Sequence, residues 1–536
     1  MRLISSDDLS LLMPTKYIKR PIEKSRKRRY HQNTPKIMYD LNDLLKIKNG
    51  KLSKQEKDLI KRAYEFSKMA HEGLKRKSGE DYFIHPFETA KTLCEWGLGP
   101  YVIAASILHD TTEDTHSSLS EIKKEFGEEI ACLVDGVTKL GHFKFRERKE
   151  DKKREKERGE NFKKMILAIS DDIRVIFIKL ADRLHNMKTL DALPEEKRNR
   201  IALETYEIYA SLAYRLGMAS VAGELEDLCL PYLFPKDYKW LQKNVSEKLE
   251  QREKYLKKVR KVIEKELKEN NLTPTRINFR AKRLSSIYKK LKKYDMNFEQ
   301  IHDLIAMRII VKNVEECYKV LGIIHSLWKP LPGKIKDYIA LPKPNGYQSL
   351  HTTVFCLDNK IAEFQIRTEK MHEEAQYGMA AHWAYEEEKE KKSYKKRKAV
   401  FADKKETAWL KQLKEWQETH GGSGGEFLNS LKDFFKDRIF AVTPKGDVID
   451  LPHDATPVDF AYHIHSEVGD ECIGAKVNGN IVQLEHKLES GDVVEIQRQK
   501  KKKPSESWLK FVKTSMAKTH IRKALREKEQ SFWKRK

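Results

Sequence analysis

The amino-terminal half of the sequence contains imidazole and carboxylate side chains in a pattern that suits a metal centre. His85 lies in FIHP, His109 and Asp110 lie together in ILHDTTED, and Asp182 lies in ADRLHNM. Imidazole nitrogens and carboxylate oxygens together favour a divalent transition metal such as Mn²⁺, with coordination positions left open for water. Each residue is ordinary by itself, as a cap, a surface acid or a core polar group. The four together predict a metal site.

Further polar residues near these motifs could handle a proton or bind a nucleotide. Glu113 follows His109 by four residues, so the two are expected on one helix face. Asp114 could assist Glu113, and Asn186 lies one helical turn beyond Asp182. The upstream sequence RKSG supplies a guanidinium that can stack on a base and two groups that can hold phosphate, namely Arg76, Lys77 and Ser78. A charged turn is the alternative interpretation.

A second group of candidate residues lies in KIKDYIALPKPNGYQSLHTTVFCLDNKIAEFQIRT, residues 334–368. The end of this stretch alternates, so one face of an extended strand carries Glu363, Gln365 and Arg367 while the other is apolar. An aromatic ring, several cations and a carboxylate are what a nucleotide site requires. The ring and the positive or titratable groups are Tyr347, Lys336, Lys343 and His351. An amphipathic edge strand with a charged loop is the alternative.

The sequence RINFRAKRLSSIYKK, residues 276–290, could hold a triphosphate. Arg280 and Lys282 are expected on one strand face, and Ser285 is expected to cap the helix that follows. Ser286 and Lys290 lie one turn apart on that helix, so its first amides and these side chains could meet phosphate oxygens. A basic surface helix is the competing interpretation.

The sequence IHDLIAMRII adds a carboxylate and a guanidinium near a strand. Asp303 and Arg308 are five residues apart, so Asp303 is expected to precede the strand or the strand is expected to be bulged. Asp303 and Glu363 could together hold Mg²⁺ and direct a hydroxyl at a phosphate.

Hydrophobic periodicity predicts an almost entirely helical region before residue 235 and a mixed region after it. Helices are predicted at 54–72, 86–97, 101–113, 118–139, 161–189 and 198–217, with a long charged helix at 236–272. Strands are predicted at 276–280, 303–312, 350–357 and 361–367, with helices at 285–294 and 314–329 between them. This alternation indicates an α/β or α+β domain.

The remaining sequence predicts linkers and a small β-grasp-type domain, in which a hairpin turning at Gly446 precedes a short helix and two more strands. The predicted divisions are a basic tail (1–45), a helical domain (46–235), a mixed domain with its connecting helix (236–385), a linker and helix (386–436), the β-grasp domain (437–499) and a basic helical tail (500–536).

Composition limits the classes of partner and compartment. The 536 residues contain 106 Lys and Arg against 81 Asp and Glu, a formal net charge of +25, which favours polyanionic partners such as nucleotides or RNA. The six cysteines form no CxxC pair, so a disulfide framework or cysteine zinc site is not expected. Long apolar runs and a signal sequence are lacking, so a soluble cytoplasmic protein without membrane partners is expected.

Several motifs together resemble the RelA/SpoT homologue family of alarmone enzymes, over roughly residues 50–530. They are RKSGE, HP, LHDTTED and ADRLHNM in the first half and DLIAMR, NGYQSLHTTV, EFQIRT and YGMAAHWAY in the second. VTPKGDVIDLP and ATPVDFAYHIH resemble that family's TGS domain. The resemblance implies a multidomain α+β protein with an all-α HD-type hydrolase domain, an α/β nucleotidyltransferase-like synthetase domain and a small β-grasp TGS domain.

For the first domain, the resemblance implies removal of the 3′-diphosphate of (p)ppGpp as pyrophosphate, with Mn²⁺. Glu113 and Asp114 would activate or orient water. The implied metal ligands are His85, His109, Asp110 and Asp182. The implied nucleotide-binding residues are Arg76, Lys77, Ser78, Asn186 and Thr189.

For the second domain, the resemblance implies transfer of pyrophosphate from ATP to the 3′-hydroxyl of GDP or GTP. Asp303 and Glu363 would hold Mg²⁺, with Glu363 also a candidate base, and Arg280 and Arg308 would sandwich adenine. The other implied roles are phosphate contacts by Lys282, Lys290 and Lys343, guanine stacking by Tyr347, and a place beside the guanine for His351.

Two departures from the family pattern matter for synthesis. Phe279 and Ala281 stand where a GRPKH-like run has Gly and Pro, which places the loop geometry and the synthetic rate in question. The run KIKD at 334–337 keeps the basic character of the bifunctional class. The alternatives are a hydrolase-dominant member with weak synthesis and a ribosome- or tRNA-binding regulator that uses the TGS domain and basic tails.

Overall fold

The computed structural model describes ten segments of the chain: residues 39–45, 52–141, 172–294, 296–297, 304–343, 345–381, 383, 438–489, 491–500 and 502–533. The chain divides into two compact units, Met1–Thr138 with Asp172–Val400, and Lys139–Asp171 with Phe401–Lys536. The predictions for Asp303, for most of the amino-terminal tail and for the linker at 386–436 lie outside the described residues.

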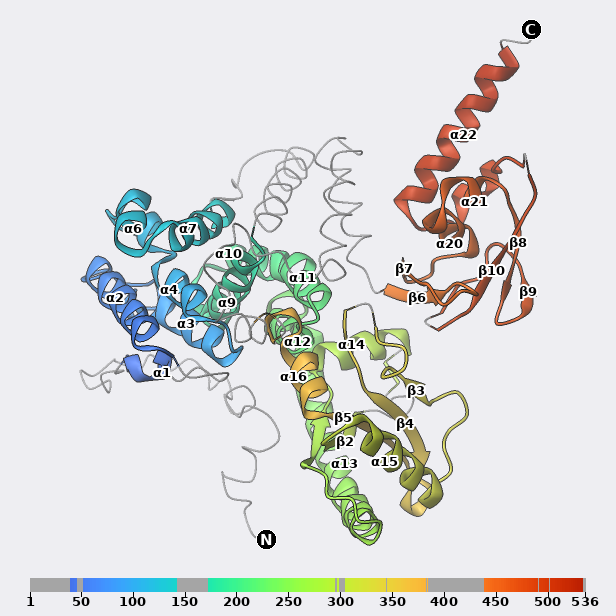
Figure 1. Ribbon diagram of the computed structural model, residues 1–536, viewed down its shortest axis with the longest axis horizontal. Helices are drawn as coiled ribbons and strands as arrows, with labels where there is room; N and C mark the ends of the chain where they lie inside the picture. Colours follow the sequence, from blue (N-terminus) through green and yellow to red (C-terminus); the bar gives the residue numbers. More distant parts are fainter. Residues whose placement is uncertain are drawn as a thin grey trace. The chain divides into compact units, whose positions relative to one another are not determined.

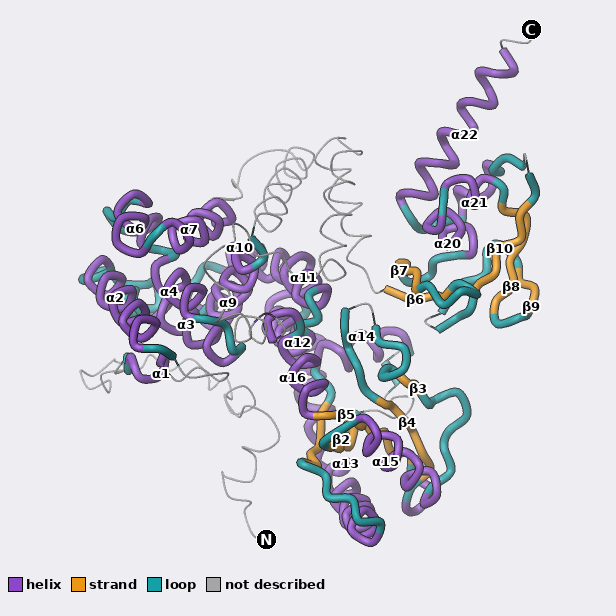
Figure 2. The backbone as a smooth tube through the Cα atoms, in the orientation of Figure 1, coloured by secondary structure: helices purple, strands orange, loops and turns teal. Residues whose placement is uncertain are grey.

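The first part of unit 1 is built from helices (Figures 1 and 2). They are α1 (Leu41–Leu45), α2 (Lys54–Ala70), α3 (Ile84–Glu95), α4 (Pro100–Leu108), α5 (Thr111–Asp114), α6 (Leu119–Phe126), α7 (Glu128–Gly141), α9 (Arg174–Lys188), α10 (Glu195–Glu204), α11 (Ala210–Arg215) and α12 (Ala219–Leu233). Ser53 and Ser118 start α2 and α6 through capping boxes, in which each serine and a glutamate satisfy two free backbone N–H groups.

Three predicted helix boundaries are wrong for local reasons. The helix predicted at 86–97 begins at Ile84, two residues before Pro86. The helix predicted at 101–113 ends at Leu108, and the short helix α5 follows it. The helix predicted at 118–139 is divided at Gly127, whose φ of +90° a helix cannot accommodate.

The second part of unit 1 is a five-stranded sheet ordered β1-β2-β5-β4-β3. The strands are β1 (Arg276–Ala281), β2 (Ile305–Val311), β3 (Lys336–Asp337), β4 (Leu350–Phe355) and β5 (Ile361–Thr368). Strands β2 and β5 pair in parallel, and the other three pairs are antiparallel. The accompanying helices are α13 (Pro235–Glu269), α14 (Leu284–Lys293), α15 (Val314–Leu327) and α16 (Glu369–Tyr377). The long helix predicted at 236–272 is therefore confirmed.

The two faces of this sheet differ in chemistry. One face packs against α13 and α15 in a single apolar core, to which β5 contributes Ala362, Phe364 and Ile366. The alternation predicted for this strand is confirmed, because Glu363 and Gln365 lie on the other face. Phe279 packs against the same core, paired with Met307, so β1 continues as a regular strand where the family pattern has a glycine.

The carboxy-terminal part of unit 2, described from Arg438 to Trp533, contains a hairpin, a second sheet and three α-helices. The hairpin joins β6 (Arg438–Val442) to β7 (Val448–Pro452), with Gly446 in its turn at a φ of +92°, as predicted. The second sheet is ordered β10 (Val494–Arg498), β8 (Cys472–Val477), β9 (Asn480–Val482), and the helices are α20 (Pro457–Ile464), α21 (Ser466–Asp470) and α22 (Ser515–Trp533).

The basic carboxy-terminal segment packs on this domain. Trp508, Val512 and Ile521 share a core with Val458 of α20. The fully buried carboxylate of Asp459 accepts hydrogen bonds from the backbone N–H groups of Thr456, Lys513 and Thr514, and from the hydroxyls of the two threonines. The domain boundary predicted between residues 499 and 500 therefore lies within a single packed unit. None of the helices in the described segments has the length and apolarity to span a membrane.

Candidate functional site

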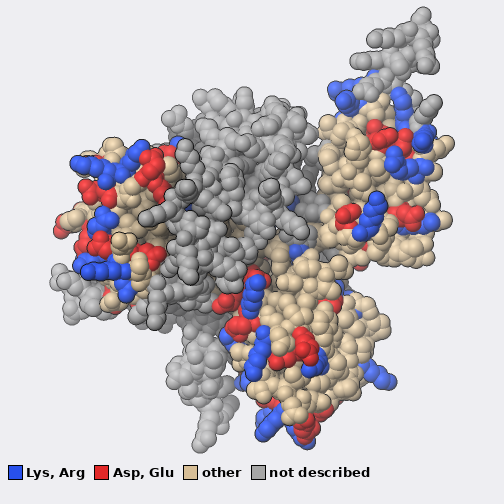
Figure 3. Space-filling model, viewed as in Figure 1, with Lys and Arg blue, Asp and Glu red and all other residues tan. Residues whose placement is uncertain are grey.

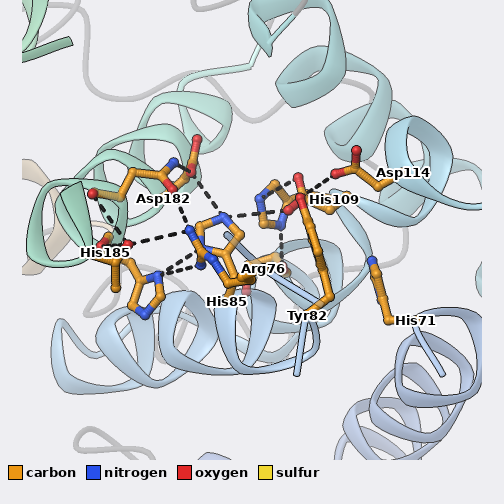
Figure 4. A network of polar contacts seen from close by, with 12 residues as sticks. His71, Arg76, Tyr82, His85, His109, Asp114, Asp182 and His185 are labelled. Carbon is orange, nitrogen blue, oxygen red and sulfur yellow. Dashed lines mark hydrogen bonds and ion pairs between the residues drawn. The ribbon is translucent and has the colours of Figure 1, made fainter. Parts of the chain in front are cut away.

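The His and Asp side chains singled out in the helical region converge from three helices (Figure 4). His85 comes from α3, His109 and Asp110 follow α4, and Asp182 lies in α9. Ligand atoms of His85, His109 and Asp182 lie within 4.8 Å of one another. The Nε2 atom of His85 is 3.2 Å from Asp182 Oδ1 and 3.5 Å from Asp110 Oδ2. The predicted set is thus brought together, and its two imidazoles are buried.

The donor set fits a divalent metal ion. The Nδ1 atom of His109 is 2.7 Å from the carbonyl oxygen of Ser106, so Nδ1 carries the hydrogen and Nε2 presents its lone pair. This buried Nε2 makes no hydrogen bond to any described residue, although Asp110 Oδ1 is 3.0 Å away. Burial raises the pKa of Asp182, but the ammonium of Lys179, 2.7 Å away, outweighs burial and holds that pKa well below its usual value.

His185 is a site residue that the sequence reasoning missed. Arg76 donates to its Nδ1 at 3.1 Å, so that nitrogen is an acceptor. The Nδ1 atom of His85 lies 2.8 Å from the same nitrogen and therefore carries a hydrogen, which leaves His85 Nε2 to face Asp182. Burial, then the neighbouring His85 and Arg76, lower the pKa of His185 to about 2. Its position three residues after Asp182, in the same motif, was an available signal.

Arg76 is held at this centre by three residues of one helix end. Besides His185, its guanidinium donates to Asn186 Oδ1 at 3.1 Å and to Thr189 Oγ1 at 3.4 Å. Lys77 and Ser78 lie exposed on the turn that follows Arg76. The structure therefore brings Arg76, Asn186 and Thr189 together beside the candidate metal ligands, and leaves Lys77 and Ser78 at the surface.

Glu113 and Asp114 lie exposed on the short helix α5, close in sequence to the candidate ligands His109 and Asp110. The expectation that Glu113 and His109 share one continuous helix is wrong, because the helix breaks after Leu108. Tyr82, which the sequence reasoning missed, donates its hydroxyl to Asp114 Oδ2 at 2.5 Å. Burial and the carboxylates of Asp110 and Asp114 raise the pKa of Tyr82, so its phenol keeps the proton that it donates.

His71 supports Tyr82 from the other side. The two rings are stacked, with centroids 5.2 Å apart and planes 3° apart. The Nδ1 atom of His71 is 2.7 Å from the carbonyl oxygen of Ser67, which fixes the ring, and burial lowers the pKa of His71. The sequence offers no pattern that links His71 to Asp114.

The second group of candidate residues lies on the polar face of the sheet. Residues paired between neighbouring strands share a face, so Arg308, Gln365 and His351 form one row across β2, β5 and β4. Glu363 lies in the adjacent row with Arg280, through their common neighbour Ala306. The structure thus gathers residues from four separate sequence motifs on one surface.

A chain of polar contacts joins the carboxylate to the aromatic loop. His351 Nδ1 is 3.4 Å from Glu363 Oε1, and His351 Nε2 is 2.7 Å from the hydroxyl of Tyr347. Gln365 Nε2 donates to Glu363 Oε1 at 3.1 Å. Burial, above all, lowers the pKa of His351, so its neutral form can orient both neighbours.

Tyr338 is a further residue of this loop that the sequence reasoning missed. Its ring lies edge-on to Tyr347 and His351, with centroids 6.0 and 5.5 Å away. Lys343 places its ammonium 4.7 Å from the Tyr338 centroid and 5.2 Å from that of Tyr347. Burial, followed by the charges of Lys336 and Arg280, lowers the pKa of Lys343 to about 8.

Positive charge on the polar face exceeds negative charge. Burial and the neighbouring Arg367 and Arg280 lower the pKa of Arg308 to about 9, and burial lowers that of Arg367 to about 10. The Nε atoms of Arg308 and Arg367 are buried without a hydrogen-bond partner in the described part of the chain. Arg367 also donates to His372 Nδ1 at 2.8 Å. Such a surface suits a polyanion, because its phosphate oxygens would relieve the repulsion.

The helix expected to bind triphosphate begins beside Arg280, but its start differs from the prediction. Ser285 does not cap α14, because the helix begins at Leu284. The backbone N–H of Ser285 instead donates to Asp227 Oδ1 of α12 at 2.8 Å. Lys282, just before α14, is half-buried, and so are Ser286 and Lys290 within the helix.

Family models match three regions of the chain. An HD domain matches residues 63–219, a region found in RelA and SpoT proteins matches residues 279–390, and a TGS domain matches residues 439–497. The fold is accordingly a multidomain α+β arrangement.

Curated relatives match across these regions. A guanosine-3′,5′-bis(diphosphate) 3′-pyrophosphohydrolase from Aquifex aeolicus is 48% identical over 89% of this chain and 66% of its own length. A GTP pyrophosphokinase from Myxococcus xanthus is 47% identical over 88% of this chain and 61% of its own length. The chain thus spans less than two thirds of either relative.

A bifunctional (p)ppGpp synthase/hydrolase, SpoT from Escherichia coli, is 42% identical over 91% of this chain and 68% of its own length. Identity at this level, over most of both chains and across all three matched domains, establishes the relationship. The chain belongs to the RelA/SpoT family.

Proposed function

We propose that this chain is a bifunctional alarmone enzyme that makes (p)ppGpp at one centre and hydrolyses it at the other. The observation that carries the proposal is that one compact unit holds two chemically different centres, a buried His/Asp group and a sheet face rich in Arg and Lys. A carboxylate–imidazole centre suits hydrolysis, and a cationic face with a carboxylate suits transfer between two polyanionic nucleotides. The printed names of relatives cover both reactions.

For hydrolysis, we assign water activation to Glu113 and Asp114. The water oxygen bonds to the phosphorus that carries the ribose 3′-oxygen, the bond between that phosphorus and the 3′-oxygen breaks, and the 3′-oxygen receives a proton. Asp114, held by the Tyr82 hydroxyl, orients the water, and Glu113 moves the proton. Nucleotide contacts are assigned to Arg76, Lys77, Ser78, Asn186 and Thr189, of which Arg76 is already positioned by His185.

Two different divalent ions are assigned to the two centres. His85, His109, Asp110 and Asp182 would hold Mn²⁺, which supplies Lewis acidity at the phosphate when bound. The free lone pair of His109 Nε2 and the lowered pKa of Asp182 support this assignment. Mg²⁺ would be held by Glu363, which lies on the sheet face, together with Asp303, because carboxylate oxygens and substrate phosphates are the usual ligands of Mg²⁺.

For synthesis, we assign the base to Glu363. The 3′-hydroxyl oxygen of GDP or GTP bonds to the β-phosphorus of ATP, the bond from that phosphorus to the oxygen of the leaving AMP breaks, and Glu363 takes the hydroxyl proton. His351 and Gln365 hold Glu363 in place, and His351 also holds Tyr347, the assigned guanine platform. Arg280 and Arg308 are assigned to adenine, and Lys282, Ser286, Lys290 and Lys343 to phosphates.

The proposed partner of the carboxy-terminal domain is RNA, either in the ribosome or as tRNA. The TGS match and exposed cations on α22 support this proposal, with Arg522, Lys523 and Arg526 on its surface. Figure 3 shows cationic and acidic side chains interspersed on the face in view, so the charge is not segregated there. We place the protein in the cytoplasm, because all six cysteines are free.

A paired assay on the purified chain tests the proposed function. One reaction contains ATP, GDP and Mg²⁺, and the other contains ppGpp and Mn²⁺. Product in both reactions is expected. Hydrolysis alone would restrict the chain to the hydrolase-dominant alternative, and product in neither would contradict the proposal in favour of an RNA-binding regulator. Asp303→Ala is expected to abolish synthesis alone.

A further inference from the structure

Helix α12 contains a notch that receives one arginine from the start of α14. The guanidinium of Arg283 donates to Ser220 Oγ through NH2 and to Asp227 Oδ2 through NH1, both at 3.3 Å. A methyl group at Gly223 would lie 2.4 Å from Arg283 Cδ and 2.8 Å from its Nε. Residues 220, 223 and 227 share one helix face, so glycine at the middle position leaves the space in which the arginine lies.

The same aspartate caps α14 from another helix. Its second oxygen, Asp227 Oδ1, accepts the backbone N–H of Ser285 at 2.8 Å, while the Arg283 side chain at the capping position makes no capping hydrogen bond. A carboxylate that accepts a free first-turn N–H and lies at the positive end of the helix dipole stabilises the helix start. The direction of α14 at its first turn is therefore set from α12.

The first two turns of α14 carry two of the side chains proposed to hold the ATP phosphates. Ser286 follows Ser285 directly, and Lys290 lies one turn further on. Only two residues, Lys282 and Arg283, connect β1 to α14. A short connection transmits displacement, so movement of Arg283 would shift Lys282 and the first turn together.

We propose that Asp227 is a positioning residue for the triphosphate side of the synthetase centre, acting through Arg283 and the backbone of Ser285. Helix α12 lies next to α14 in the structure (Figure 1). In the sequence, Asp227 falls between the HD match, which ends at residue 219, and the RelA and SpoT match, which begins at residue 279. This inference rests on the proposed assignment of ATP to α14. The affinity of the synthetase centre for ATP thus depends on Asp227, which lies outside both matched regions.

Three variants and one control separate this role from general folding. Asp227→Ala removes the cap and the ion pair, and Asp227→Asn keeps an oxygen for Ser285 but loses the charge facing Arg283. Gly223→Ala displaces Arg283 while replacing glycine by the best helix former, so α12 itself should not be weakened. Glu226→Gln is the matched control, because Glu226 also contacts α14, through Lys289 at 2.7 Å, without capping it.

The measurements are KM for ATP and for GDP in synthesis, the affinity for a non-hydrolysable ATP analogue by calorimetry, and ppGpp hydrolysis by the same preparation. For Asp227→Ala we expect KM for ATP and the analogue Kd to rise about five- to tenfold, the value of a lost helix cap. Gly223→Ala and Asp227→Asn should show smaller rises. KM for GDP, the hydrolysis rate and the Glu226→Gln control should stay unchanged.

Unchanged ATP affinity in Asp227→Ala and Gly223→Ala would overturn the inference. A parallel loss of ATP affinity, GDP affinity and hydrolysis would overturn it too, since that pattern reports a damaged fold. If the unaltered chain makes no (p)ppGpp, the proposed function fails instead, and the calorimetric comparison still decides the role of Asp227.

Discussion

The two candidate centres of unit 1 balance their charges in opposite ways. In the helical centre, Lys179 forms an ion pair with Asp182, and the guanidinium of Arg76 donates to neutral oxygen and nitrogen acceptors. On the sheet face, burial and then neighbouring cations lower the pKa values of Arg308, Arg367 and Lys343 to about 9, 10 and 8. The helical centre is assembled before substrate arrives, whereas the sheet face lacks negative charge that a nucleotide would bring.

This difference indicates where each centre should be sensitive. A preassembled centre depends on the position of a few donor atoms, so conservative changes there should reduce turnover more than affinity. A surface with excess positive charge depends on its protonation state, so pH and anions should act on substrate affinity.

The largest expected effect comes from Asp110, whose carboxylate contacts both imidazoles. Asp110→Asn keeps the shape and leaves the ion pair of Lys179 and Asp182 in place. Hydrolysis should fall about a thousandfold, because loss of a ligand charge weakens metal-assisted catalysis by several kcal/mol. Metal content and hydrolysis rate are the measurements, and synthesis by the same sample is the control. An unchanged hydrolysis rate together with an unchanged metal content would contradict the assignment of Asp110 as a metal ligand.

The corresponding change on the sheet face is Glu363→Gln. Synthesis should fall about a hundredfold or more, since a general base contributes at least that factor. Hydrolysis should stay unchanged, because His85 and Asp182 belong to the other centre. Measuring both rates in one preparation tests the separation, and equal loss of both activities would contradict the two-centre arrangement.

A smaller effect is expected when Tyr82 loses the hydroxyl that holds Asp114. Tyr82→Phe keeps the stack on His71 but removes one hydrogen bond to a carboxylate. The kcat of hydrolysis should fall about tenfold, consistent with a hydrogen bond to a charged group, while KM changes little. Tyr64→Phe is a matched control, because its hydroxyl donates to the backbone carbonyl of Tyr39 and to no carboxylate within the described segments. A rise in KM without loss of kcat would assign Tyr82 to substrate binding instead.

The smallest effect is the pH dependence of the sheet face. Because the pKa of Lys343 is about 8, its ammonium loses charge above that pH, and kcat/KM for synthesis should decline there by a few fold. Lys343→Arg should move the decline to higher pH. A profile unchanged in this variant would exclude Lys343 as its origin.

The contribution of Lys343 to the free energy of unfolding should change with pH in the direction opposite to the change in synthesis. The folded pKa of about 8 lies below the usual 10.5, so the unfolded chain binds more protons between these values. The contribution of Lys343 to folding therefore becomes more favourable as pH rises from about 8 to 10.5. The excess stability of Lys343→Met over the unaltered chain should be greatest below pH 8 and vanish above 10.5, as chemical denaturation would measure.

Local sequence patterns predicted much of the fold because the relevant physics is local. The alternation at 361–367 placed Phe364 in the core and Glu363 on the polar face, as the structure has them. Helix ends were predicted less well, since a positive φ at Gly127 or the break after Leu108 depends on what packs around the turn. The metal-site prediction needed several motifs at once, because each His or Asp alone has many ordinary uses.

The sequence by itself determined which side chains could ligate, pair or stack, since residue type sets chemistry and spacing sets the face of an element. Only the tertiary structure decided that His185 fixes the tautomer of His85, that Tyr82 holds Asp114, and that Asp227 caps α14. These contacts join residues that are 100, 32 and 58 positions apart. Hydrogen bonds over such separations follow from the packing of whole helices, and the local hydrophobic periodicity of the sequence does not encode that packing.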